Sequence, residues 1–187
     1  MTGIDLVIND LKTRIDTIDY MKTVYGRATV MQTLWGDSNI VQVPKVWTGT
    51  EYSMPLPNDT LEPMSFFQAL RLENYGVFDR IEIGNINRQV AVTFWGKLGE
   101  AGTPLSTEDI KFDFIERLQK SPYVSAINSF VDERYQDVFP DFAGYFGKIR
   151  VKSEKGFEQE TQYLMQPYGG FRLVFTVNYI QTPASCR

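Results

Sequence analysis

The chain contains no histidine. Imidazole is the side chain best suited to proton transfer near neutral pH, and it is the commonest metal ligand in proteins. Its absence excludes a Ser-His-Asp triad, a Cys-His pair and every histidine-ligated metal centre. The single cysteine, Cys186, excludes an internal disulfide and a CxxC zinc site, and we expect its thiol to be exposed and incidental. Most common catalytic chemistry is thus excluded, and we expect no catalytic residue, cofactor or metal.

An excess of basic residues is also missing. With 19 Lys and Arg against 23 Asp and Glu, the net charge is -4. A dedicated nucleic-acid-binding protein normally carries a basic surface, so this balance argues against that class. The chain lacks a run of about 18 apolar residues, and its first residues lack the basic and then apolar pattern of a secretion signal. We expect a soluble protein that is made in a reducing compartment and does not enter a membrane.

The residues that are present have an ordinary globular composition, with 43% hydrophobic and 22% charged side chains. A chain of 187 residues can bury roughly 70% of the surface that it exposes when unfolded, so it needs no disulfide or metal to fold. No linker, internal repeat or low-complexity tract divides the sequence. We expect a single domain over residues 1–187.

Two segments have the spacing of amphipathic helices. Apolar residues recur at three- and four-residue steps from Ile4 to Ile18. A second helix is predicted over Thr107–Lys120, because acidic residues follow its start, where the helix dipole favours negative charge. The apolar stripe of this second helix consists of Ile110, Phe114 and Leu118.

Several segments are rich in strand-forming residues or alternate between apolar and polar side chains. Residues 66–72 fit a short helix and a strand equally well. Helices and strands in this order predict an α+β fold, with a mostly antiparallel sheet flanked by two main helices. The predicted strands are Thr29–Trp35, Arg88–Leu98, Val124–Val131, Lys148–Lys152 and Phe171–Ile180, the last set off by Gly169 and Gly170.

Residues 36–64 interrupt this pattern with four prolines and only short apolar runs. We interpret them as an extended loop or β-hairpin excursion, with a hairpin turn at Thr48-Gly49-Thr50, where glycine can supply a positive φ. An excursion of this length inside a compact domain is usually functional or interfacial.

Aromatic residues make up 14% of the chain, and many fall in predicted loops or at the edges of elements. Aromatic side chains in such places are enriched at protein–protein interfaces, because they bury a large area at low entropic cost. The alternative is a second small core beneath the long loops. The candidate interface residues are Trp47, Tyr52, Tyr135, Phe139, Phe142, Tyr145 and Phe146.

One group of carboxylates could act in acid–base chemistry or hold an oxygen-ligated metal ion. Its spacing matches no calcium loop, and an equally dense group of acids lies in the first helix. A solvated acidic surface is therefore the favoured interpretation of Asp132, Glu133, Asp137 and Asp141.

The order of these elements resembles the tail-terminator and head–tail joining proteins of tailed bacteriophages, including neck ring proteins. The resemblance covers most of the chain and depends on architecture, since no diagnostic motif is present. It is carried by the N-terminal helix, the proline-containing stretches Val43–Trp47 and Met54–Asp59, the strand Val90–Trp95, the helix Thr107–Lys120 and the closing strand Phe171–Tyr179.

The resemblance implies a structural virion protein without catalytic residues, assembled in the host cytoplasm. In that family a sheet flanked by helices oligomerises into a ring around the DNA channel. We expect a ring of roughly 6 or 12 copies. Its other partners would be adjacent neck, tail or portal-side virion proteins. DNA would pass through the lumen without specific binding, and a mildly acidic chain suits such a lining.

Two other classes of function stay open from the residues alone. The carboxylate group would suit a small metal-dependent enzyme, which titration with Mg²⁺ or Ca²⁺ would test. The exposed aromatic residues would suit a non-viral adaptor that binds a different protein.

Overall fold

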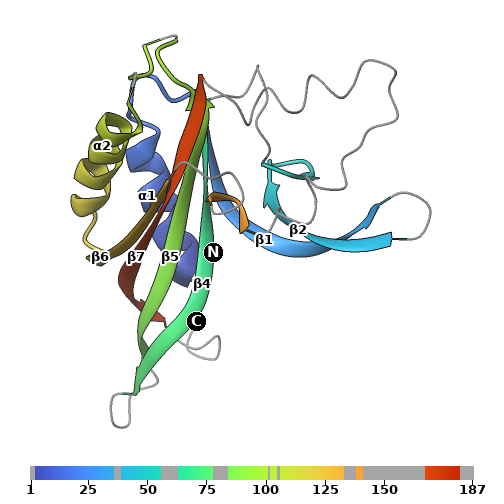
Figure 1. Cartoon of the computed structure of the whole chain (residues 1–187). Coiled ribbons are helices and arrows are strands. Elements are labelled where there is room, and N and C mark those ends of the chain that lie inside the picture. Colours follow the sequence, from blue (N-terminus) through green and yellow to red (C-terminus); the bar gives the residue numbers. More distant parts are fainter. Residues whose placement is uncertain are drawn as a thin grey trace.

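The structure is a computed structural model that describes residues 3–35, 39–55, 63–77, 84–100, 102–104, 106–132, 138–140 and 167–181. The described strands form one seven-stranded sheet in the order β3-β2-β1-β4-β5-β7-β6, and both helices lie on one side of it (Figure 1). The α+β fold is therefore confirmed. In chain order the elements are α1 (Gly3–Ile15), β1 (Thr23–Trp35), β2 (Asn39–Trp47), β3 (Tyr52–Ser53), β4 (Met64–Val77), β5 (Gly84–Lys97), α2 (Thr107–Gln119), β6 (Val124–Asp132) and β7 (Tyr168–Gln181).

Helix α1 buries the stripe that its sequence predicts but ends three residues earlier than expected, at Ile15. The amide of Ile18 donates to the carbonyl of Ile15 at 3.0 Å, and that of Thr17 donates to Arg14 at 3.3 Å. These three-residue steps tighten the last turn, which is a common way for a helix to end. Ile18 lies beyond the helix and is still only 5% exposed, so the apolar stripe outlasts the helix itself.

Helix α2 follows its sequence closely. Ser106 is the N-cap in an extended conformation, and its hydroxyl accepts a hydrogen bond from the amide of Glu108 at 3.1 Å. Ile110, Phe114 and Leu118 are fully buried, as predicted.

The strands are longer than the sequence suggests. β1 begins at Thr23, six residues before the predicted start, and the ambiguous residues 66–72 belong to strand β4. Gly169 and Gly170 lie inside β7 and do not precede it. A Cβ on Gly170 would lie 2.2 Å from the Phe94 carbonyl oxygen, so glycine at this position allows a close approach of β5.

Strand β1 changes partners along its length. Its first half pairs in parallel with β4, from Thr23–Met64 to Ala28–Gln68, and from Ala28 onwards it pairs antiparallel with β2. Beyond this point the β1–β2 ribbon bends away from strands β4 to β7 as an arm that extends away from the two helices (Figure 1). We call the part of this ribbon from residue 28 to residue 46 the arm.

Part of the predicted 36–64 excursion is regular structure. β2 pairs with β1 from Asn39 to Val46, and it also pairs with β3 through Trp47–Tyr52 and Val46–Ser53. The predicted hairpin turn is confirmed, since Gly49 has a φ of 105°. Met64 is already the first residue of β4, and residues 56–62 lie outside the described part of the chain. So does the predicted strand Lys148–Lys152.

Both faces of the central strand β5 are buried. Val90, Val92 and Phe94 belong to the larger core, which lies beneath the helices. Trp95 belongs to a second core, whose other members include Met64, Phe66 and Phe139. The alternation predicted for this strand is thus confirmed, with apolar cover on each face.

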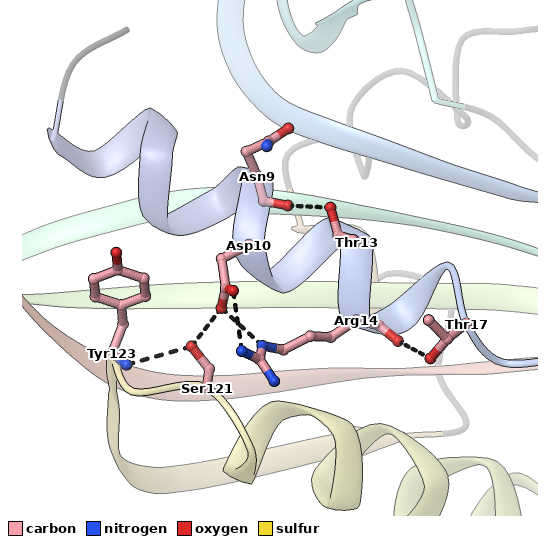
Figure 2. A network of polar contacts seen from close by, with 7 residues as sticks. All are labelled: Asn9, Asp10, Thr13, Arg14, Thr17, Ser121 and Tyr123. Carbon is pink, nitrogen blue, oxygen red and sulfur yellow. Dashed lines mark hydrogen bonds and ion pairs between the residues drawn. The ribbon is translucent and has the colours of Figure 1, made fainter.

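Polar contacts fix the position of α1 beside α2 (Figure 2). The Asp10 carboxylate accepts hydrogen bonds from Arg14 at 2.8 Å and from the Ser121 hydroxyl, just after α2, at 2.7 Å. The Ser121 hydroxyl also accepts from the amide of Tyr123 at 3.3 Å. Burial opposes ionisation of Asp10, but the hydrogen bonds from Arg14 and Ser121 outweigh it and hold the pKa of Asp10 below its usual value.

Candidate functional site

An open groove of about 660 Å³ lies between α1 and the base of the arm. Asp5, Asn9 and Lys12 line it from the helix, and Arg27 lines it from β1. Its volume falls within the roughly 300–1,000 Å³ range of ligand pockets. We call it the α1 groove.

Trp47 and Tyr52 form the rim of the α1 groove opposite the helix. They are direct partners across the β2–β3 pair, and their ring centroids lie 5.1 Å apart at an interplanar angle of 55°. Trp47 is 55% exposed and Tyr52 is 51% exposed. Two large rings are therefore held in a fixed arrangement while half of their surface faces solvent. Their role at an interface stays a prediction.

An irregularity in β1 shapes the floor of the groove. Val24 pairs with Ser65 and Arg27 with Phe67, so two residues of β1 oppose one residue of β4 between these pairs. Such a bulge turns the following side chains to the other face of the strand. Arg27 consequently points to α1, where its Nη1 donates to the Asp5 carboxylate at 2.8 Å.

The charges of the α1 groove are unevenly paired. The Asp5–Arg27 ion pair bridges the groove, with both side chains about one-third exposed (36% and 34%). The Lys12 ammonium has no ion-pair or hydrogen-bond partner among the described residues. As far as the described residues go, the groove thus offers an apolar rim together with one positive charge that no carboxylate pairs with. This combination suits a partner surface that presents an apolar side chain next to a carboxylate.

Phe139 does not lie on the surface, contrary to the prediction. It is 1% exposed and packs against Phe66 at 5.9 Å and Trp95 at 5.5 Å between ring centroids. Here the alternative of a second small core is right, because the second face of the sheet needs an apolar cover. The other candidate interface residues, Tyr135, Phe142, Tyr145 and Phe146, lie outside the described residues.

The candidate carboxylates fall mostly outside the structure's described ranges. Asp132 ends β6, and nothing is described of its side chain, while Glu133, Asp137 and Asp141 lie beyond those ranges. Within the described residues, no group of three or more His, Cys, Asp or Glu side chains could hold a metal ion.

The sequence reasoning missed one exposed aromatic residue. Phe112 of α2 is 64% exposed, more than Trp47 or Tyr52. The helical spacing carries the signal, since Phe112 lies opposite the stripe of Ile110, Phe114 and Leu118.

Comparison with known proteins adds no relative, because no family model and no curated protein matches the chain. In the described part of the chain, neither helix is long and apolar enough to cross a membrane.

Proposed function

We propose that the chain is a structural protein of a tailed-phage virion, which assembles into a ring at the neck or at the end of the tail, around the DNA channel. The observation that carries the proposal is the arm, which bends away from β4 at Ala28 (Figure 1). This feature adds to the resemblance in the order of elements.

A two-stranded ribbon is marginally stable in water when nothing packs against it. Ala28, Val43 and Val46 of the arm are buried in the second core, whereas Val30 is 46% and Ile40 is 68% exposed. Burying these side chains against another molecule would remove apolar surface from water, at about 25 cal/mol per Å². An arm of this kind suits a subunit that is completed by its neighbours.

Light scattering and negative-stain images of one purified sample test this proposal. The expected result is closed rings of uniform diameter with a fixed number of subunits. Discrete dimers, or filaments that never close, would contradict it.

The α1 groove also favours a second candidate, an adaptor that binds a different protein. Half-exposed aromatic pairs are common at such interfaces. A mass that stays monomeric at every concentration would favour the adaptor over the ring.

A further inference from the structure

The outer surface of α2 carries an apolar side chain among acids. Phe112 projects from this surface, and Glu108, Asp109 and Glu116 lie three or four residues away, on the same side of the helix. Glu108 and Glu116 are paired with Lys111 and Lys120, whereas Asp109 has no ion-pair or hydrogen-bond partner among the described residues. We call this surface, Phe112 with Asp109 and its neighbouring acids, the α2 ridge.

The α1 groove has the complementary character. Its rim is the aromatic pair of Trp47 and Tyr52, and its unpaired charge is the ammonium of Lys12. The exposed Phe112 ring beside the Asp109 carboxylate would thus match the aromatic rim beside the Lys12 ammonium.

The groove and the ridge lie on different sides of the helix layer. At 100° per residue, Asp5, Asn9 and Lys12 fall on one flank of the buried stripe of α1, and Asp10 and Arg14 fall on the other. Asp10 contacts Ser121, just after α2, so α2 lies on the flank away from the groove (Figure 2).

We propose that the α2 ridge of one copy docks in the α1 groove of a second copy of this chain. Phe112 would contact Trp47 and Tyr52, and Asp109 would approach Lys12. The docked helix would lie beside α1, next to strands β2 and β3; of the described helices, α1 packs on β1, β4 and β7, and α2 packs on β6 and β7. This inference rests on the proposed function and names the two surfaces that join neighbouring subunits.

Such a contact joins two different surfaces, so every copy keeps one free groove and one free ridge. Head-to-tail contacts of this kind close into a ring when the rotation between copies fits, and otherwise continue as a filament. One interface could therefore build the whole ring.

The first experiment measures self-association by sedimentation velocity over a concentration series. Phe112→Ala and Trp47→Ala should each weaken association by roughly 30-fold or more, the size of a hot-spot loss. Leu6→Ala is the matched control, since Leu6 is 52% exposed on α1 and does not line the groove. All three side chains are exposed, and circular dichroism verifies that each variant folds. Association of Phe112→Ala equal to that of Leu6→Ala would overturn the inference, as would a wild-type chain that never associates.

Mixing the two variants gives a sharper test. Each variant alone lacks half of every contact and should be monomeric at a concentration that lies between the dissociation constants of the wild type and the variants. In the mixture, the intact groove of Phe112→Ala can receive the intact ridge of Trp47→Ala, so dimers and nothing larger should form. A mixture that stays monomeric, or one that grows beyond dimers, would refute the head-to-tail contact.

Charge reversal tests the polar half of the contact. Lys12→Glu and Asp109→Lys should each weaken association, and combining both in one chain should restore it at low salt. Losses that simply add in the double variant would overturn the pairing of these two residues.

The inference and the proposed function can fail separately. If rings form in the wild type and still form in Phe112→Ala, the ridge–groove contact is refuted and the ring proposal stands. If the wild type forms filaments that both Phe112→Ala and Trp47→Ala abolish, the contact is supported and the ring proposal is refuted.

Discussion

Replacing Gly170 by alanine should destabilise the fold strongly, although it adds a single methyl group. A Cβ at this position would lie 2.2 Å from the Phe94 carbonyl oxygen and 2.3 Å from Cε3 of Trp95. The first atom is backbone of the central strand β5, and Trp95 is 2% exposed and packed against Phe139. Neither atom can yield without moving a strand. Overpacking typically costs about 1–3 kcal/mol, and we expect about 3 kcal/mol here because backbone must shift.

Gly26→Ala is the matched control for this prediction. A Cβ on Gly26 would meet nothing within 4 Å, because this residue borders the open groove. Its backbone does not require a positive φ, so the change should lie within about 1 kcal/mol of neutral and can stabilise by restricting the unfolded chain.

Urea unfolding followed by tryptophan fluorescence measures both variants at one protein concentration. With a slope of about 2 kcal/mol per M, a loss of 3 kcal/mol lowers the midpoint by about 1.5 M. The reasoning would be refuted if Gly170→Ala moved the midpoint by less than about 0.3 M, or if both variants moved it equally.

Three further changes test the core, a helix cap and an ionised network. Phe139→Ala should cost about 3–5 kcal/mol in urea unfolding, because the ring is buried, whereas the half-exposed Trp47 should cost little when it is replaced by alanine. Ser106→Ala removes the N-cap of α2 and should cost about 1 kcal/mol in the same assay. The pKa of Asp10 is lowered, so its ionised network stabilises the fold above about pH 4 and this stabilisation is lost as pH falls through the folded pKa. Thermal unfolding from pH 5 to pH 2.5 should therefore show a smaller loss of stability in Asp10→Asn than in the wild type.

Each of these expectations can be contradicted directly. Equal losses for Phe139→Ala and Trp47→Ala would mean that the second core is misassigned. Unchanged stability in Ser106→Ala would mean that the cap contributes nothing to α2. Parallel pH profiles for the wild type and Asp10→Asn would remove the network as a source of acid sensitivity.

Local signals were enough to predict some elements. α2 has an N-cap, acids in its first turn and a regular apolar stripe, and these all depend on neighbours in the sequence. In β5, Val90, Val92 and Phe94 lie on one face and Trp95 lies on the other, as the sequence predicts. In both elements, the face predicted for each of these apolar side chains is the face it occupies in the structure.

Other features depend on distant residues and could not be predicted. The start of β1 was missed because its bulge near Gly26 breaks the alternation that identifies a strand. The burial of Phe139 can be predicted only when it is known that Phe66 and Trp95 lie on the second face of the sheet and need an apolar cover. The α1 groove combines α1, β1 and the β2–β3 pair, and no spacing within one segment places Lys12 near Trp47.

The order of strands in the sheet has a consequence for synthesis of the chain. β7 lies between β5 and β6, although it is the last described strand in the sequence. A nascent chain can pair β1 with β2 and β4 with β5 locally, but the outer edge of β5 has to wait for residues 168–181. Ribosomes add about 5–20 residues per second, so this edge of β5 stays unpaired for seconds after the strand is made. The pairing of β7 with β5 and β6 would therefore be the step that completes the core. A chain truncated before Tyr168 would be prone to aggregate.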